Sequence, residues 1–133
     1  MSGEGVELVR RAYAHTQATG QVYSEGFDPG FVWDMSKYEG WPEQQRYEGV
    51  DGAQTFLDDW TDAWDDWELE IEEVYEAGEK VVVVLHQRGR ARTTRMALNM
   101  VFAQIWTIRD GRLTRMDMYS DPSEALRALD LEG

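Results

Sequence analysis

The chain has 133 residues, of which 42% are hydrophobic and 12% aromatic, and its net charge is −13. This length fits one domain, residues 1–133, with a single core or a core that contains a pocket. The composition is that of a folded chain, despite the charge. Such acidity argues against nucleic acid as a partner, because binding to phosphates depends on Lys and Arg. The lack of cysteine excludes disulfides, thiolate metal sites and cysteine nucleophiles.

Apolar runs in this sequence are short. The N-terminal segment has none of signal-peptide length, and the longest aliphatic run, residues 81–85, is too short to span a bilayer. We therefore expect a cytoplasmic protein without a membrane partner.

The first third of the chain alternates between helical and extended patterns. Apolar residues recur at helical spacing over 6–16, and Gly20 is a stop signal. A short second helix is predicted within 21–29, a strand over 31–36, and a turn-rich loop over 39–49.

Residues 58–73 hold nine of the 26 acids, three tryptophans and no basic residue. Asp51 is a candidate helix cap, and the next apolar positions share one helical face: Ala53, Phe56, Leu57, Trp60 and Trp64. From Trp67 onward the apolar period changes to two. The acidic stretch is therefore predicted to be an amphipathic helix that runs into a half-buried strand.

The second half reads as strands joined by turns. Strands are predicted over 80–90, 95–109 and 112–120, with Asp110-Gly111 as a hairpin turn. Asp121 then opens a short last helix. Helices followed by long antiparallel strands indicate an α+β fold, with helices on one face of a bent sheet.

This order of elements resembles the nuclear transport factor 2-like superfamily. The segments that carry the resemblance are VRRAYAHTQATG, FVWD and FAQIWTIRDGRLTRMDMYSDPSEAL, and they are most similar to the SnoaL-like branch of polyketide cyclases and to ketosteroid isomerases. The resemblance implies a curved antiparallel sheet wrapped around N-terminal helices, forming a cone with an internal pocket (a cystatin-like α+β barrel). It also implies a small, mostly apolar ligand and a homodimer.

The resemblance carries over only part of a catalytic set. Tyr13 matches the oxyanion-hole tyrosine of ketosteroid isomerases, and Asp34 matches their general base. Gln104 stands where those enzymes have a protonated aspartic acid, and Met118 stands where SnoaL-type cyclases have their acid or base. Asp117 is adjacent, but a one-residue offset in a strand turns its side chain to the opposite face.

Other side chains are candidate pocket walls. The predicted ligand contacts are Trp60, Trp64, His86, Phe102, Gln104, Trp106 and Met118. Tyr13 can equally be a core residue with a satisfied hydroxyl. A single candidate site histidine and no cysteine give no basis for a metal site.

Two surface features suggest contacts. Val101, Ala103 and Ile105 are apolar on the outer face of their strand, which favours cover by a second subunit through that face. The basic hairpin 88–95 either pairs with the acidic helix or a partner subunit, or is a solvated turn.

Two functions follow. One is a cofactor-independent enzyme of the isomerase, cyclase or hydrolase type, in which Asp34 moves a proton of a small apolar carbonyl compound and Tyr13 or Gln104 steadies the oxyanion. The other is a non-catalytic ligand-binding or dimerisation module with the same fold.

Overall fold

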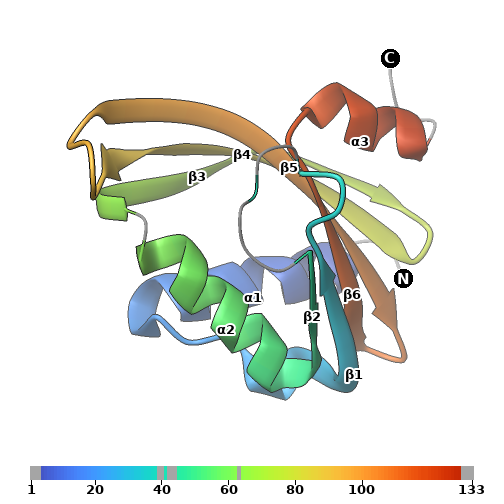
Figure 1. The fold of residues 1–133 in the computed structure, drawn as a ribbon. Helices are drawn as coiled ribbons and strands as arrows, with labels where there is room; N and C mark the ends of the chain where they lie inside the picture. The colour runs from blue at the N-terminus through green and yellow to red at the C-terminus, as the bar shows by residue number, and fades with distance from the viewer. Residues whose placement is uncertain (1–3, 39–40, 42–44, 63, 130–133) are drawn as a thin grey trace.

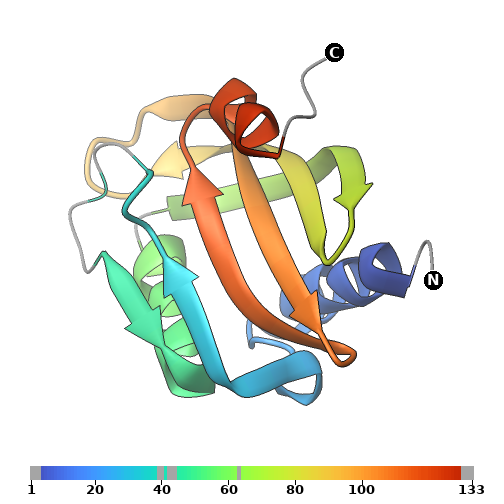
Figure 2. The same cartoon turned by 90° about the vertical axis from the view of Figure 1, so that its right-hand side faces the viewer.

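The computed structural model describes residues 4–38, 41, 45–62 and 64–129. A curved sheet of six strands, in the order β2-β1-β6-β5-β4-β3, wraps around two helices (Figure 1; Figure 2). The strands are β1 (Phe27–Asp34), β2 (Arg46–Glu48), β3 (Trp64–Ala77), β4 (Lys80–Ala91), β5 (Ala97–Arg109) and β6 (Arg112–Tyr119). The helices are α1 (Glu4–Thr19), α2 (Gly49–Asp62) and α3 (Pro122–Ala128), with a 3-10 turn, η1 (Ser24–Gly26).

The predicted α+β fold with a curved sheet is confirmed. Strands β3 to β6 follow one another as antiparallel neighbours. One pair departs from the prediction, because β1 runs parallel to β6, with Trp33 beside Met116 and Asp34 beside Asp117. No hairpin joins these two strands, so their connection does not impose an antiparallel direction.

The N-terminal third agrees with the sequence in part. Helix α1 ends where Gly20 adopts a φ of +73° and donates its N–H to the carbonyl of Thr16 at 2.8 Å. The second helix expected within 21–29 is wrong: only η1 forms, and β1 already begins at Phe27. The segment 39–49 contains β2, which its turn-rich composition concealed, while 39–40 and 42–44 lie outside the described residues.

The acidic stretch does run from a helix into a strand. Helix α2 begins at Gly49, so Asp51 lies in its first turn and does not cap it, and Trp64 belongs to β3 and not to the helix. A β-bulge between Asp65 and Glu68 interrupts the pairing with β4 near its start. A Cβ on the facing Gly89 would come within 2.9 Å of both Trp64 and Trp67, so β4 needs glycine there.

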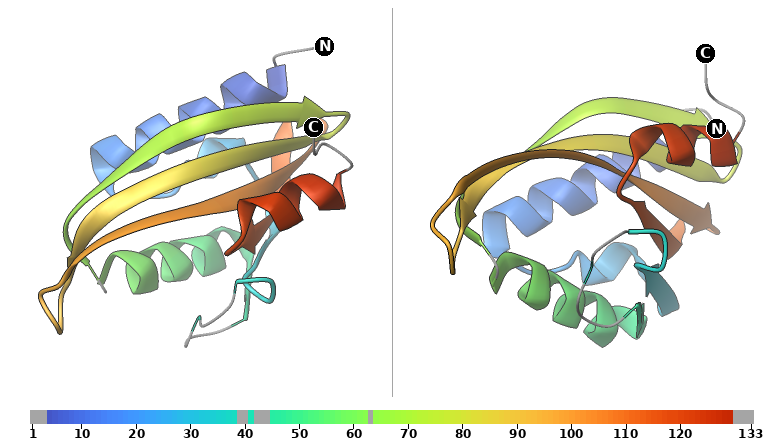
Figure 3. Two further views of the ribbon diagram at one scale, coloured as in Figure 1. Left: turned by 90° about the horizontal axis from the view of Figure 1, so that it is seen from above. Right: turned by 45° about the horizontal axis from the view of Figure 1, so that its top comes forward.

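The hydrophobic core lies on both faces of the sheet. The larger part is aromatic and fills the concave face against α1 and α2. The smaller part lies on the convex face, where α3 packs over β5 (Figure 3) and covers Ala103 and Ile105. The expected cover by a second subunit is therefore wrong for these two residues, since α3 of the same chain covers them. Val101 stays 44% exposed.

The basic hairpin pairs with the acidic stretch. The guanidinium of Arg92 lies 2.9 Å from Asp62 and 3.1 Å from Asp65, and Arg95 also pairs with Asp65. Arg88 lies 2.5 Å from Glu70. Asp62, Asp65 and Glu70 are thus balanced by arginines of the same chain, and the hairpin is held against the junction of α2 and β3. Within the described part of the chain, none of the helices has the length and hydropathy to cross a membrane.

Candidate functional site

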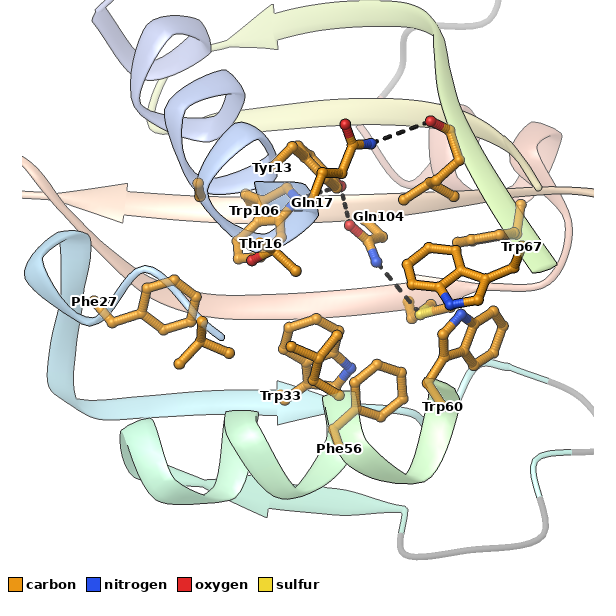
Figure 4. A pocket seen from close by; sticks show the side chains of 16 residues that line it. Tyr13, Thr16, Gln17, Phe27, Trp33, Phe56, Trp60, Trp67, Gln104 and Trp106 are labelled. Carbon is orange, nitrogen blue, oxygen red and sulfur yellow. Dashed lines mark hydrogen bonds between the residues drawn. The ribbon is translucent and has the colours of Figure 1, made fainter. Parts of the chain in front are cut away.

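A pocket opens between the concave face of the sheet and helices α1 and α2 (Figure 4). Its cavity is about 70 Å³ and its walls are mostly apolar. The lining residues are Ala12, Tyr13, Thr16, Gln17, Val22, Phe27, Trp33, Phe56, Leu57, Trp60, Trp67, Leu69, Phe102, Gln104, Trp106 and Met118. The volume is well below the roughly 150 Å³ of a cavity that holds benzene, so a six-membered ring fits with part of it in the mouth.

A chain of hydrogen bonds crosses one wall. Trp106 Nε1 donates to the hydroxyl of Tyr13 at 3.2 Å, and that hydroxyl donates to Gln104 Oε1. Because the indole can only donate, the hydroxyl accepts from Trp106 and keeps its own proton for the amide oxygen. The order Trp106 to Tyr13 to Gln104 therefore fixes the orientation of the amide.

The fixed amide presents a donor to the pocket. Among the described residues, the hydrogen-bond partner of Gln104 Nε2 is the sulfur of Met118, at 3.6 Å, and a thioether is a weak acceptor. Burial raises the pKa of Tyr13 well above its usual value, although the hydrogen bond from Trp106 acts in the opposite direction. The tyrosine is therefore neutral at physiological pH and donates to Gln104, and the group that this wall offers to the pocket is the uncharged N–H of Gln104.

The opposite wall is made of stacked aromatic rings. Trp33 stacks on Phe56 with ring centroids 4.3 Å apart and an interplanar angle of 25°. Trp60 packs against Phe102 at 5.5 Å, and its Nε1 donates to the buried Gln87 at 2.9 Å. These contacts hold the rings in place and leave flat apolar surfaces facing the cavity.

The mouth lies between the end of α1 and β3. There the side-chain amide of Gln17 donates to the carbonyl of Leu69 at 3.2 Å, bridging the two elements (Figure 4). Next to this bridge lies a polar groove that shares Thr16, Gln17, Trp67 and Leu69 with the pocket and also has Glu68, Glu70 and Arg88 on its sides. A ligand that enters here passes carboxylates before it reaches the apolar walls.

Comparison with known proteins agrees with this architecture. The model of the SnoaL-like domain family matches residues 7–116. The chain belongs to the SnoaL-like domain family. A comparison with curated proteins gave no significant match.

Solved structures with the same fold are distant in sequence. TerC, co-crystallized with polyporic acid, has a TM-score of 0.75 and 23% identity over 96% of this chain and 98% of its own. A candidate SnoaL-like polyketide cyclase from Jannaschia sp. CCS1 has a TM-score of 0.72 and 20% identity over 98% and 94%. A protein of ketosteroid isomerase-like fold from Catenulispora acidiphila, in complex with trimethylamine, has a TM-score of 0.70 and 15% identity over 95% and 94%. At these identities the likeness shows the fold alone.

Asp34 does not line the pocket of this SnoaL-like domain. Its neighbour Trp33 faces inward, so strand alternation turns Asp34 to the outer face. There its carboxylate lies 2.6 Å from Arg115 Nη2 and accepts from the amide and hydroxyl of Ser36 at 2.8 and 2.6 Å. The expectation that Asp34 is a base inside the cavity is therefore wrong in its geometry.

The surroundings of Asp34 favour its charged form. Partial burial acts to raise the pKa of Asp34, but the hydrogen bonds from Ser36 and the charges of Lys37 and Arg115 outweigh it and lower the pKa below its usual value. A carboxylate stabilised in this way is a weak base. Arg115 also binds Asp117 at 3.0 Å, which makes the outer cluster a structural ion-pair network.

Two further predicted contacts lie outside the pocket. His86 lies on the outer face of β4, where its Nε2 is 2.9 Å from Asn99 Oδ1 and its Nδ1 is 3.7 Å from Glu72. Trp64 is buried at the start of β3 beside Trp60 but is not among the lining residues. Trp64 was assigned to the helix but begins β3, whereas the run of valines in β4 left the face of His86 undetermined.

The other predicted site residues do meet in the pocket: Tyr13, Trp60, Phe102, Gln104, Trp106 and Met118. The pocket also contains residues that were not predicted to line it: Trp33, Phe56 and Trp67 in the wall and Gln17 at the mouth. The alternation of Trp33 with Asp34 is a signal that finds one of them, because only one of two neighbouring strand residues can face inward. Among the described residues, no cluster of three or more His, Asp or Glu side chains could hold a metal ion.

Proposed function

We propose that this SnoaL-like domain binds a compact, neutral, mostly apolar carbonyl compound in the pocket. The observation that carries the proposal is the amide of Gln104, which is held by Tyr13 and Trp106 with its N–H groups at the edge of an otherwise apolar cavity. A site of this kind derives affinity from apolar contact and orientation from one or two polar groups. A carbonyl oxygen is the simplest group that accepts from an amide donor.

The electrostatics of the entrance favour a neutral ligand. Glu68 and Glu70 line the groove, and its one lining arginine, Arg88, is already paired with Glu70. The net charge of −13 adds long-range repulsion of anions. A carboxylate ligand is therefore disfavoured relative to a ketone or ester of the same shape. Polyporic acid and trimethylamine in two structural neighbours support the choice of a small organic ligand.

A pair of ligands of equal shape tests the proposal. Cyclohexanone and methylenecyclohexane differ only in C=O against C=CH2, and both are titrated by NMR. The wild-type protein is expected to prefer the ketone by about threefold to tenfold, the usual value of one hydrogen bond. Gln104→Met should remove that preference and leave the alkene affinity nearly unchanged. Equal binding of the two ligands to the wild type, or no binding of either, would refute the proposal.

A second candidate is a cofactor-independent enzyme of the cyclase or isomerase type. The observation that favours it is the buried pair of Tyr13 and Gln104, since the amide N–H that Tyr13 orients can steady an oxyanion in a desolvated site. Among the described lining residues there is no carboxylate or imidazole to remove a proton. Exchange of the α-hydrogens of bound cyclohexanone in D2O separates the two functions: an enzyme accelerates the exchange and loses it in Tyr13→Phe, whereas a binding protein leaves the rate unchanged.

We also propose a homodimer through the outer face of the sheet. Helix α3 leaves the part of this face around Val101 uncovered, and Val101 lies opposite His86 in the register of β4 and β5. Light scattering on the wild type and on Val101→Lys tests this. A dimer that becomes a monomer in the variant supports the interface, and a monomeric wild type refutes it.

A further inference from the structure

The pocket is too small to enclose a ring-sized ligand. Its cavity of about 70 Å³ leaves part of a six-membered ring in the mouth, so a substituent on that ring lies outside. An open groove of about 580 Å³ borders the mouth and shares four lining residues with the pocket: Thr16, Gln17, Trp67 and Leu69. The side chains of this groove therefore contact the outer end of the ligand.

Two neutral side chains offer hydrogen-bond acceptors to the groove. Gln17 donates from its amide nitrogen to the carbonyl of Leu69 at 3.2 Å, which holds the nitrogen against β3 and leaves the amide oxygen without a partner among the described residues. In Figure 4 that oxygen lies on the side turned away from Gln104. Thr16 donates from its hydroxyl to the carbonyl of Gln21 at 3.0 Å. Each side chain thus has its donor atom bound to the backbone and can accept from a ligand.

A carboxylate without an ion pair lies in the same groove. Arg88 stands opposite Glu68 in the register of β3 and β4, but its guanidinium lies 2.5 Å from Glu70. Glu68 is exposed and forms no ion pair within the part of the chain that the structure describes. Its neighbour Trp67 is half-buried and lines both the pocket and the groove. A carboxylate beside an indole ring attracts a protonated amine.

We propose that the groove is a subsite for a protonated amine, so that the preferred ligands are carbonyl compounds with an aliphatic ammonium group at the other end. This rests on the proposed function, which concerns the neutral end held by Gln104, and adds the group that lies outside the pocket. The net charge of −13 attracts cations to this face and disfavours a carboxylate there. Because the groove is open to solvent, the ammonium group should increase affinity by about fivefold at low ionic strength.

The matched ligands are 4-(dimethylaminomethyl)cyclohexanone and 4-isobutylcyclohexanone, which have the same shape and differ by a protonated nitrogen in place of a CH group. We expect the wild type to bind the amine about fivefold more tightly in NMR titrations at low salt. The preference should shrink as salt is added, because the carboxylate is exposed and its field is screened. 4-Oxocyclohexaneacetic acid, which carries a carboxylate at the same position, should bind less tightly than either.

Two variants assign the preference to the groove. Glu68→Gln removes the unpaired carboxylate and should abolish most of the preference, while the affinity for 4-isobutylcyclohexanone stays nearly unchanged. Glu72→Gln is the matched control, because it removes the same charge from the same strand outside the groove and should keep the preference. Equal affinities of the wild type for the two ligands would overturn the subsite. Equal preferences in the two variants would overturn it as well, because the general charge of the protein would then suffice.

The position of the bound amine can be observed directly. NOEs from its N-methyl protons should reach Gly20 and Glu68, which line the groove alone. NOEs to Phe27 or Trp33, which line the pocket alone, would place the amine inside and contradict the proposal. If the amine gives no advantage but cyclohexanone still binds in a Gln104-dependent way, the proposed function stands without the subsite. If no ketone binds the wild type, both proposals are overturned.

Discussion

Removing the hydroxyl of Tyr13 should destabilise the protein substantially. Tyr13→Phe deletes one atom but leaves two buried groups, Trp106 Nε1 and Gln104 Oε1, without their partner. An orphaned buried donor or acceptor costs about 1–3 kcal/mol. The two together predict a loss of about 2–6 kcal/mol in the free energy of unfolding. For a chain of this length, that corresponds to a fall in Tm of roughly 10–20 °C.

Tyr23→Phe is the matched control, because it removes the same atom from a half-buried tyrosine. The hydroxyl of Tyr23 makes no hydrogen bond in the described part of the chain, and its ring packs against His15 at 5.3 Å. Its loss should change stability by less than about 0.5 kcal/mol. Urea unfolding of both variants is the assay. Equal, small losses of stability in the two variants would refute the view that the Tyr13 hydroxyl bonds Trp106 to Gln104.

A double-mutant cycle then isolates the link between Tyr13 and Gln104. Gln104→Met strands the tyrosine proton, whereas the double variant removes both partners. The double variant should therefore be about 1 kcal/mol or more stable than the sum of the single losses predicts. Additive losses would mean that the two side chains stabilise the fold independently, and the fixed orientation of the amide would lose its support.

Three other perturbations test parts of the structure outside this wall. Gly89→Ala places a Cβ 2.9 Å from the Trp67 side chain and should cost about 1–3 kcal/mol in urea unfolding; a neutral result would mean that β3 lies farther from β4. Gln17→Met removes the bridge to β3 across the mouth, so stopped-flow ligand association and dissociation should both accelerate with Kd unchanged; unchanged rates would place the entrance elsewhere. The pKa of Asp34 is lowered on folding, so the stability it provides exists at neutral pH and is lost as the pH falls below about 4. Asp34→Asn should be less stable than the wild type at pH 7, and its free energy of unfolding should fall less steeply in acid. An unchanged dependence on pH below about 4 would contradict the pairing with Arg115.

The fold could be predicted from the sequence because its signals are local. Gly20 ends α1, Asp110-Gly111 joins β5 to β6, and Asp121 caps α3 by accepting from Ser123 N at 2.9 Å. Periodicity located α2 and β3, although it placed Trp64 on the helix and the change of period at Trp67. The elements that were missed, β2 and the parallel pairing of β1, depend on partners distant in sequence. No local pattern encodes such a pairing.

The site was predicted only in part, because it depends on which of two adjacent residues faces inward. Gln104 and Trp106 lie in the middle of a long regular strand, where alternation is reliable, and both reached the pocket. Asp34 ends a strand whose start was misplaced, and Trp64 stands at a helix-to-strand junction. In β4 the run of four valines has no alternation, so nothing local assigned His86 to the outer face.

The alternation of inward and outward side chains along a strand also determines what chemistry the pocket can perform. Strands β1 and β6 pair with Trp33 beside Met116 and Asp34 beside Asp117, so one face of the pair is apolar and the other carries two carboxylates. Arg115 binds both carboxylates on the outer face, at 2.6 and 3.0 Å, and their charges are used for stability. Acid–base groups that the resemblance led one to expect in the cavity are thus replaced by indole, thioether and amide. Such a wall can orient a carbonyl group through hydrogen bonds, but among its described residues only Tyr13 carries a proton that can ionise. This is why selective binding is the first function to test and proton transfer the second.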